Sequence, residues 1–212
     1  MSLISLGVGV VVGAVLSRLI PAAGALLSSV PLWIGMGAAI IYAFGRSRPA
    51  GLLKLKPVDF LWALAAGLAL RMSEGWLGGA GGQAFPSLAT LDGVPPSTWW
   101  IEQAVPAGLV APALEEFYFR AVLLIGVYQI CRRLVGHFAA GVTALLASSG
   151  AFVLVHGLYV ALSLQDCVQY FLVGAACALL VLFSGRVWGA VLTHVVYNVS
   201  YLALVLAGTL LR

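Results

Sequence analysis

The chain has 212 residues, of which 62% are hydrophobic and 8% are charged, and its formal net charge is +4. Soluble domains carry about 25% charged residues, so this composition excludes an ordinary soluble domain and indicates a polytopic membrane protein. The mean hydropathy of +1.08 agrees with that class. The positive charge follows from where lysine and arginine lie between apolar segments, and it does not require a nucleic-acid partner.

Apolar stretches near the ~20 residues needed to cross a bilayer occur seven times along the chain. They lie at residues 3–20, 23–44, 58–77, 99–131, 138–161, 168–185 and 187–211. The sequence therefore predicts an all-α, polytopic transmembrane helical bundle of about seven spans. We expect a single integral-membrane domain over residues 1–212, with its motif-bearing core at about 99–200.

Two of these segments contain residues that predict local structure. The segment 99–131 is too long for one straight crossing. Pro106 and Pro112 are expected to break it into an interfacial piece and a shorter span that begins just before Glu115. In the first segment, Gly9 is followed four residues later by a second glycine, a spacing that favours close packing against another helix.

Basic residues gather in three of the predicted connections. They are Arg46, Arg48, Lys54 and Lys56 in the first, Arg132 and Arg133 in the second, and Arg186 in the third. Cytoplasmic loops carry an excess of lysine and arginine, so the sequence predicts a cytoplasmic N-terminus and an outer C-terminus, with Arg18 and Arg212 outside. We expect a multi-pass protein of the inner or plasma membrane of the cell.

Three charged side chains, Glu115, Glu116 and Arg120, lie inside an otherwise apolar segment. A charged side chain at bilayer depth costs roughly 2.5–3.5 kcal/mol on insertion scales, so these residues indicate function. Glu116 and Arg120 are four residues apart and can pair on one helix face. Glu115 is rotated about 100° from Glu116 and would face elsewhere.

Two later segments carry histidines. His156 follows Phe152 by one helical turn, and His194 precedes Asn198 by one turn. His194 and Asn198 share a helix face, and both side chains can donate hydrogen bonds, as an oxyanion hole requires. By the segment limits, His156 lies toward the outer face and His194 lies in the inner half. The sequence therefore does not decide on which side a shared cavity would open.

In this order and on three segments, the patterns EExxxR, FxxxH and HxxxN are intact in residues 115–120, 152–156 and 194–198. The chain resembles the CAAX prenyl protease and bacteriocin-processing family, also described as abortive-infection proteins. The resemblance covers roughly residues 99–200 and implies a glutamate-type intramembrane endopeptidase without a cofactor. It also implies a membrane-embedded or lipid-modified peptide or protein substrate, contact with membrane lipids, and no nucleic-acid partner.

The resemblance further implies a role for each motif residue. Glu115 and His156 would activate a water, with Glu115 as general base; His194 and Asn198 would stabilise the oxyanion; Glu116 and Arg120 would position and tune the site. A peptide bond needs these elements: an activated nucleophile, a polarised carbonyl and a proton for the leaving amine.

Two other catalytic chemistries use residues from the same segments. Glu115, His156 and His194 would supply three zinc ligands with an open fourth position. However, the chain has no HExxH pattern, which would place two histidine ligands and a general-base glutamate on one helix. A serine mechanism would use Ser149 with a histidine from another helix, which leaves both glutamates without a role.

Two functions without proteolysis also remain open. The first is a membrane scaffold or regulator, although intact motifs argue against it. The second is a transporter or proton channel that uses buried glutamate and histidine. Arg71 and Glu74, three residues apart in the third segment, would fit a polar path, but we interpret them as a structural pair.

Overall fold

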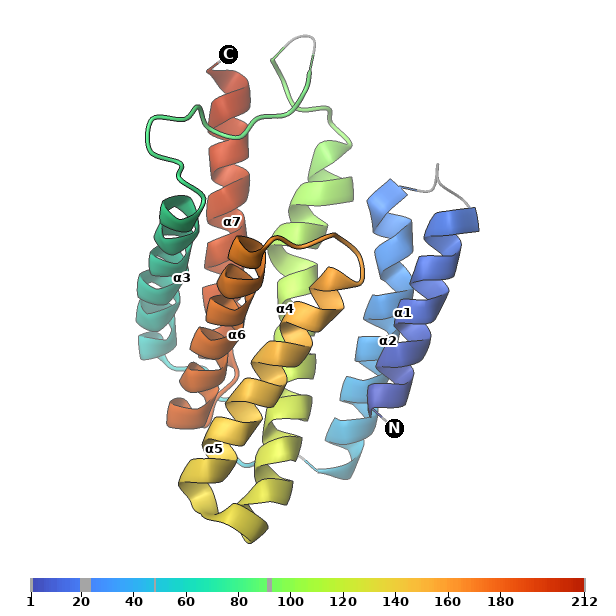
Figure 1. Ribbon diagram of the computed structural model, residues 1–212, viewed down its shortest axis with the longest axis vertical. Helices are drawn as coiled ribbons and strands as arrows, with labels where there is room; N and C mark the ends of the chain where they lie inside the picture. Colours follow the sequence, from blue (N-terminus) through green and yellow to red (C-terminus); the bar gives the residue numbers. More distant parts are fainter. Residues whose placement is uncertain (1, 20–23, 48, 91–92, 212) are drawn as a thin grey trace.

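The computed structural model describes residues 2–19, 24–47, 49–90 and 93–211, and within them all regular structure is helical. The helices stand as a bundle of roughly aligned rods (Figure 1), which confirms the all-α prediction. They are α1 (Ser2–Leu19), α2 (Gly24–Arg46), α3 (Pro57–Leu77), α4 (Ala111–Glu116), α5 (Ile125–Gly157), α6 (Leu164–Ser184) and α7 (Trp188–Leu210), with π-helical stretches at Trp100–Ala104, Pro106–Val110 and Phe117–Leu124.

Residues 100–157 form one helical hairpin that contains α4 and α5. The chain reverses within α5 at Gly136, whose φ of 78° is open to glycine at little cost. Figure 1 shows this bend at one extreme of the bundle, where the chain passes from green to yellow and turns back. We call residues 100–135 the first arm and residues 137–157 the second arm.

The predicted break at Pro106 and Pro112 is wrong, because the first arm continues through both prolines. Hydrogen bonds around Pro106 shift to partners five residues away. The amide of Val105 donates to the carbonyl of Trp100, and that of Ala111 donates to the carbonyl of Pro106. Such π-helical turns let the helix pass the prolines, which have no N–H to donate, without ending.

Within the part of the chain that the structure describes, three helical segments are long and apolar enough to cross a membrane: the hairpin over Trp100–Gly157, α6 and α7. A shorter apolar helix occupies Ile4–Leu16 within α1. The length and apolar composition of these segments identify an integral membrane protein. The total of about seven spans stays a prediction.

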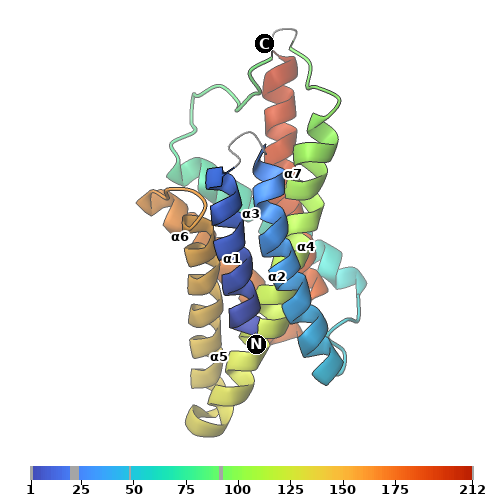
Figure 2. The ribbon, with the colours of Figure 1, turned by 90° about the vertical axis from the view of Figure 1, so that its right-hand side faces the viewer.

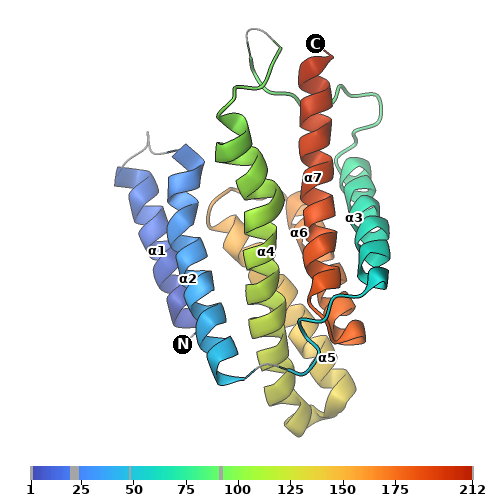
Figure 3. The same ribbon diagram turned by 180° about the vertical axis from the view of Figure 1, so that it is seen from behind.

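The helices pack in a defined order across the bundle. Figure 2 shows α1 beside α2, and Figure 3 shows α2, the first arm, α7 and α3 following one another, while the second arm packs on α6. Glycines permit the closest approaches between helix backbones. A Cβ atom on Gly9 would lie 2.5 Å from the carbonyl oxygen of Pro31 in α2, so the predicted close packing of Gly9 is confirmed.

The end of α2 with the α2–α3 connection, the bend of α5 and the α6–α7 connection lie at one end of the bundle (Figure 1), which we call the basic end. Its basic residues are Arg46, Lys54, Lys56, Arg132, Arg133 and Arg186. The chain enters α1 toward this end and leaves α7 at the other. Arg48 and Arg212 lie outside the described residues, and the side chain of Arg18 is not described. The cytoplasmic placement of the basic end stays a prediction.

An ion pair ties α3 to the α6–α7 connection at the basic end. Arg186 Nη2 lies 2.6 Å from Asp59 Oδ1, and Arg186 Nε lies 3.1 Å from Asp59 Oδ2. The two-point contact with the carboxylate raises the pKa of the Arg186 guanidinium. Asp59 is buried at the start of α3, so this contact fixes where α3 begins relative to α7.

Candidate active site

Glu115 and His156 line the same cavity, of about 450 Å³. Glu115 comes from α4 in the first arm, and His156 from the last turn of the second arm. The Glu115 side chain is 12% exposed, and His156 is half-buried. The hairpin thus brings residues from two predicted segments to one space that is large enough for a few peptide side chains.

The ring of His156 has a fixed orientation. Its Nδ1 lies 2.9 Å from the carbonyl oxygen of Phe152. A carbonyl oxygen only accepts, so Nδ1 carries the proton of this hydrogen bond, and in the neutral ring Nε2 keeps its lone pair. The ring is stacked on Tyr170 of α6, with centroids 4.5 Å apart and an interplanar angle of 28°. Nε2 of His156 is therefore the nitrogen left for chemistry.

Glu116 and Arg120 form the predicted ion pair, with Oε2 and Nε 3.0 Å apart and both side chains fully buried. The guanidinium also donates from Nη2 to the carbonyl of Gly174 on α6, at 3.2 Å. It lies over the ring of Phe152, 5.0 Å from its centroid. A buried charge needs such partners, because desolvation of an unpaired guanidinium is costly.

His194 of α7 lies between the two glutamates. Its Nδ1 is 3.0 Å from Glu116 Oε1, and its Nε2 is 3.9 Å from Glu115 Oε2. An ionised carboxylate only accepts hydrogen bonds, so Nδ1–H donates to Glu116 and Nε2 faces Glu115. The His194 side chain is 4% exposed. The contact with Glu116 was not predicted from the sequence.

Asn198 is one turn further along α7. Its Nδ2 donates to the carbonyl oxygen of Ala107 at 2.8 Å, and Ala107 itself lines the cavity. Asn198 thus contacts a residue that lines the cavity without lining it itself, and its amide nitrogen has a second N–H. The sequence placed His194 and Asn198 on one helix face, and both are directed toward the first arm.

Phe152 contacts three other motif side chains of the site, and the sequence did not predict these contacts. Its ring centroid lies 4.4 Å from that of His156 and 5.6 Å from that of His194. Because it also lies under Arg120 and is fully buried, it fixes three motif side chains at once. This explains physically why a phenylalanine precedes the histidine by one turn.

The sequence placed His156 and His194 at different depths, and the structure resolves this conflict. The bend of α5 lies beyond the α6–α7 connection at the basic end (Figure 1). The second arm therefore starts farther out than α7, and a residue near its end comes level with one near the start of α7.

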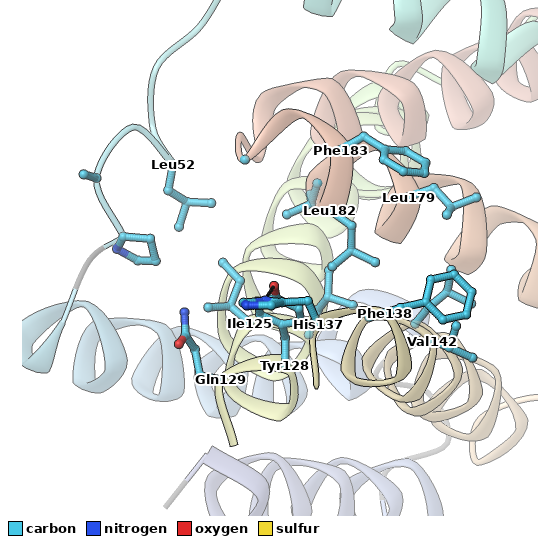
Figure 4. Close-up of a pocket in the computed structure, with 17 residues that line it drawn as sticks. Leu52, Ile125, Tyr128, Gln129, His137, Phe138, Val142, Leu179, Leu182 and Phe183 are labelled. Carbon is cyan, nitrogen blue, oxygen red and sulfur yellow. Dashed lines mark hydrogen bonds between the residues drawn. The ribbon is translucent and has the colours of Figure 1, made fainter. Parts of the chain in front are cut away.

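A larger cavity, of about 520 Å³, lies near the bend of α5 (Figure 4). Most of the lining residues labelled in Figure 4 are apolar, and none of the seven motif residues lines this cavity. The polar contact there is between Tyr128 Oη and His137 Nδ1, at 2.9 Å. A third cavity, of about 350 Å³, borders Arg71 and Glu74. We place the candidate site in the smaller 450 Å³ cavity because Glu115 and His156 line it and His194 lies 3.9 Å from Glu115.

Arg71 and Glu74 form an ion pair, as the structural interpretation predicts. Both also contact Tyr197 of α7, since its hydroxyl donates to Glu74 Oε2 at 2.6 Å and its carbonyl accepts from Arg71 Nη2 at 2.8 Å. Ser149, the serine candidate, is fully buried, and its Oγ has no hydrogen-bond partner among the described residues. The described residues contain no group of three His, Cys, Asp or Glu placed to hold a metal.

Helical segments that cross a membrane and enclose a cluster of glutamate, histidine and asparagine define an integral membrane protein with a polar site inside its bundle. Residues 97–200 match the family model described as type II CAAX prenyl endopeptidase Rce1-like. Residues 97–200 therefore belong to the CAAX protease family, as the three motifs predict, and this is a family of peptidases. No curated protein and no solved structure gives a significant match.

Proposed function

We propose that the protein is an intramembrane endopeptidase that hydrolyses a peptide bond of a membrane-associated substrate with a water activated by Glu115 and His156. The observation that carries this proposal is that both side chains line one cavity. His194 Nε2 lies 3.9 Å from Glu115 Oε2, so a second imidazole nitrogen lies beside the proposed base. The family match supports the reaction class.

In the proposed reaction, a water in the cavity donates one hydrogen bond to His156 Nε2 and the other to Glu115. Because His156 Nδ1–H donates to the carbonyl oxygen of Phe152, Nε2 is the nitrogen that can accept a hydrogen bond from the water. Glu115 takes the proton as general base while the water oxygen bonds to the carbonyl carbon of the substrate. The product of this step is a tetrahedral intermediate with a negative charge on its former carbonyl oxygen.

His194 and Asn198 are the proposed donors to that oxygen. His194 donates from Nε2 when the ring carries both protons, with Nδ1–H held by Glu116. Asn198 donates with the amide N–H that Ala107 does not use. When the intermediate collapses, the C–N bond breaks, and Glu115 returns its proton to the leaving amine nitrogen.

Glu116 and Arg120 are proposed as positioning residues. Glu116 orients His194, and Arg120 neutralises Glu116 while packing on Phe152. Neither side chain is exposed, so neither is expected to touch the substrate.

The test is cleavage of a candidate peptide library by purified protein in detergent. We expect Glu115→Gln to abolish turnover while elution volume and thermal stability stay those of the unmodified protein. Glu74→Gln is the matched control, because it neutralises an intramembrane carboxylate whose partners are Arg71 and Tyr197. Wild-type turnover in Glu115→Gln would refute the assignment of the base.

The same assay separates the alternatives. Both histidines have Nδ1 tied to an acceptor, as metal-bound histidines commonly do, whereas the described residues hold no three-ligand group, so chelators test zinc ligation directly. Activity that EDTA and phenanthroline remove and zinc restores would favour the zinc mechanism. Activity indifferent to chelators favours the glutamate mechanism. A partner protein that binds wild type and Glu115→Gln equally, with no cleavage by either, would favour the scaffold.

A further inference from the structure

The cavity that contains Glu115 and His156 faces away from the basic end. Its lining comes from the early part of α2, the start of the first arm, the end of the second arm and the start of α6. All four of these segments lie toward the end of the bundle where α7 finishes (Figure 1). The rim includes exposed residues beyond the second arm, among them Tyr159, which is 37% exposed.

The orientation of the bundle follows from its charges. The six described basic residues of the basic end come from three regions far apart in the chain: the end of α2 with the α2–α3 connection, the stretch of α5 just before its bend, and the α6–α7 connection. Lysine and arginine near the ends of spans are retained on the cytoplasmic side. Arg71, the described arginine of α3, is paired with Glu74 and lies inside a helix rather than in a connection. The basic end is therefore the cytoplasmic end.

From these two observations we infer that the catalytic cavity opens to the extracytoplasmic side of the membrane. This inference rests on the function proposed above and names its substrate class. The substrate is an exported, membrane-anchored polypeptide that presents its scissile bond at the outer face, next to the anchor. A peptide confined to the cytoplasm has no access to the cavity unless it is first translocated.

Thiol labelling of the full chain tests the orientation without any need for activity. In a background with Cys131, Cys167 and Cys177 changed to alanine, Tyr159→Cys places a thiol at the cavity rim. Lys54→Cys places one at the basic end, where the side chain is exposed. In intact cells, a membrane-impermeant maleimide should label Tyr159→Cys, and it should label Lys54→Cys only after permeabilisation. The reverse pattern, or equal labelling of both in intact cells, overturns the proposal.

A second measurement covers the case in which the cysteine-free protein does not fold. Alkaline phosphatase fused to the C-terminus of the natural sequence is active only outside the cytoplasm. Since α7 finishes at the same end as the cavity, we expect an active fusion. An inactive fusion at full expression level overturns the inference.

Cleavage in sealed proteoliposomes separates this inference from the proposed function. The orientation of the inserted protein is read from labelling at Tyr159→Cys, and a peptide cut in detergent is added outside. Cleavage only by protein with its rim outward supports the inference. Cleavage only by protein with its rim inward refutes it while the peptidase assignment stands. An outward rim in cells combined with no cleavage of any peptide in detergent refutes the proposed function while the orientation stands.

Discussion

His194 Nδ1 lies 3.0 Å from Glu116 Oε1, although 78 positions separate the two residues in the sequence. Glu116 also pairs with Arg120, so one buried carboxylate joins a guanidinium on its own helix to an imidazole on α7. Changes at Arg120 or His194 should therefore affect both the stability of the bundle and the arrangement of the proposed catalytic groups.

Arg120→Ala should destabilise the protein by about 3–5 kcal/mol, because it leaves Glu116 as a buried charge without its guanidinium partner. The double variant Arg120→Met with Glu116→Gln removes both charges and should recover most of that stability without recovering activity. Reversible unfolding in detergent measures the first effect, and peptide turnover the second. An Arg120→Ala protein with wild-type stability and turnover would overturn the role of the pair.

His194→Ala and Asn198→Ala should each lower kcat on the order of 10²–10³-fold, the usual effect of losing one oxyanion donor. Ser200→Ala is the control on the same helix, since its hydroxyl donates to the carbonyl of Tyr197 away from the cavity. The measurement is single-turnover cleavage at saturating peptide. A loss confined to KM would instead assign these side chains to substrate binding.

Tyr170→Ala should lower kcat by about 5–10-fold, because it removes a stacking interaction that on average contributes ~0.5–1.5 kcal/mol beyond burial and holds the ring of His156. Tyr170→Phe keeps the ring and should rescue turnover. Comparing kcat with thermal stability for both variants separates positioning of His156 from a general loss of packing. Equal losses in both variants would assign the effect to the hydroxyl and not to the stack.

Gly9→Ala should lower the free energy of unfolding by roughly 1–3 kcal/mol, the range found for overpacked interiors. Its new Cβ would lie 2.5 Å from the carbonyl oxygen of Pro31, an atom of the α2 backbone. Gly7→Ala is matched in helix and chemistry, but a Cβ there has no atom within 4 Å. Thermal unfolding of the two variants side by side checks the difference, and equal stabilities would contradict the close contact of α1 with α2.

Short-range relationships could be predicted from the sequence. The four-residue spacing of Glu116 and Arg120, the shared face of His194 and Asn198, and the helical class all follow from helix periodicity and composition. The side of the bundle on which basic residues gather was also predictable. These features depend on neighbours within one or two turns, or on totals over a segment.

Contacts between distant segments could not be predicted from periodicity. The hydrogen bond from His194 to Glu116 and the stack of Tyr170 on His156 depend on how α6 and α7 pack against the hairpin. The sequence also misjudged Pro106 and Pro112, because a proline that ends an α-helix can be accommodated by a local shift to π-helical bonding. Which of the two occurs is decided by the packing of the whole segment.

The bend at Gly136 lies almost midway along the sequence between Glu115, the proposed base, and His156. Glu115 precedes it by 136 − 115 = 21 residues, and His156 follows it by 156 − 136 = 20 residues. In two antiparallel arms of equal rise, residues equally far from the bend lie at the same height. Inserting one helical turn into a single arm would offset the pair by about 5.4 Å, whereas one turn in each arm would preserve their alignment. The matched length of the two arms therefore brings Glu115 and His156 to the same cavity.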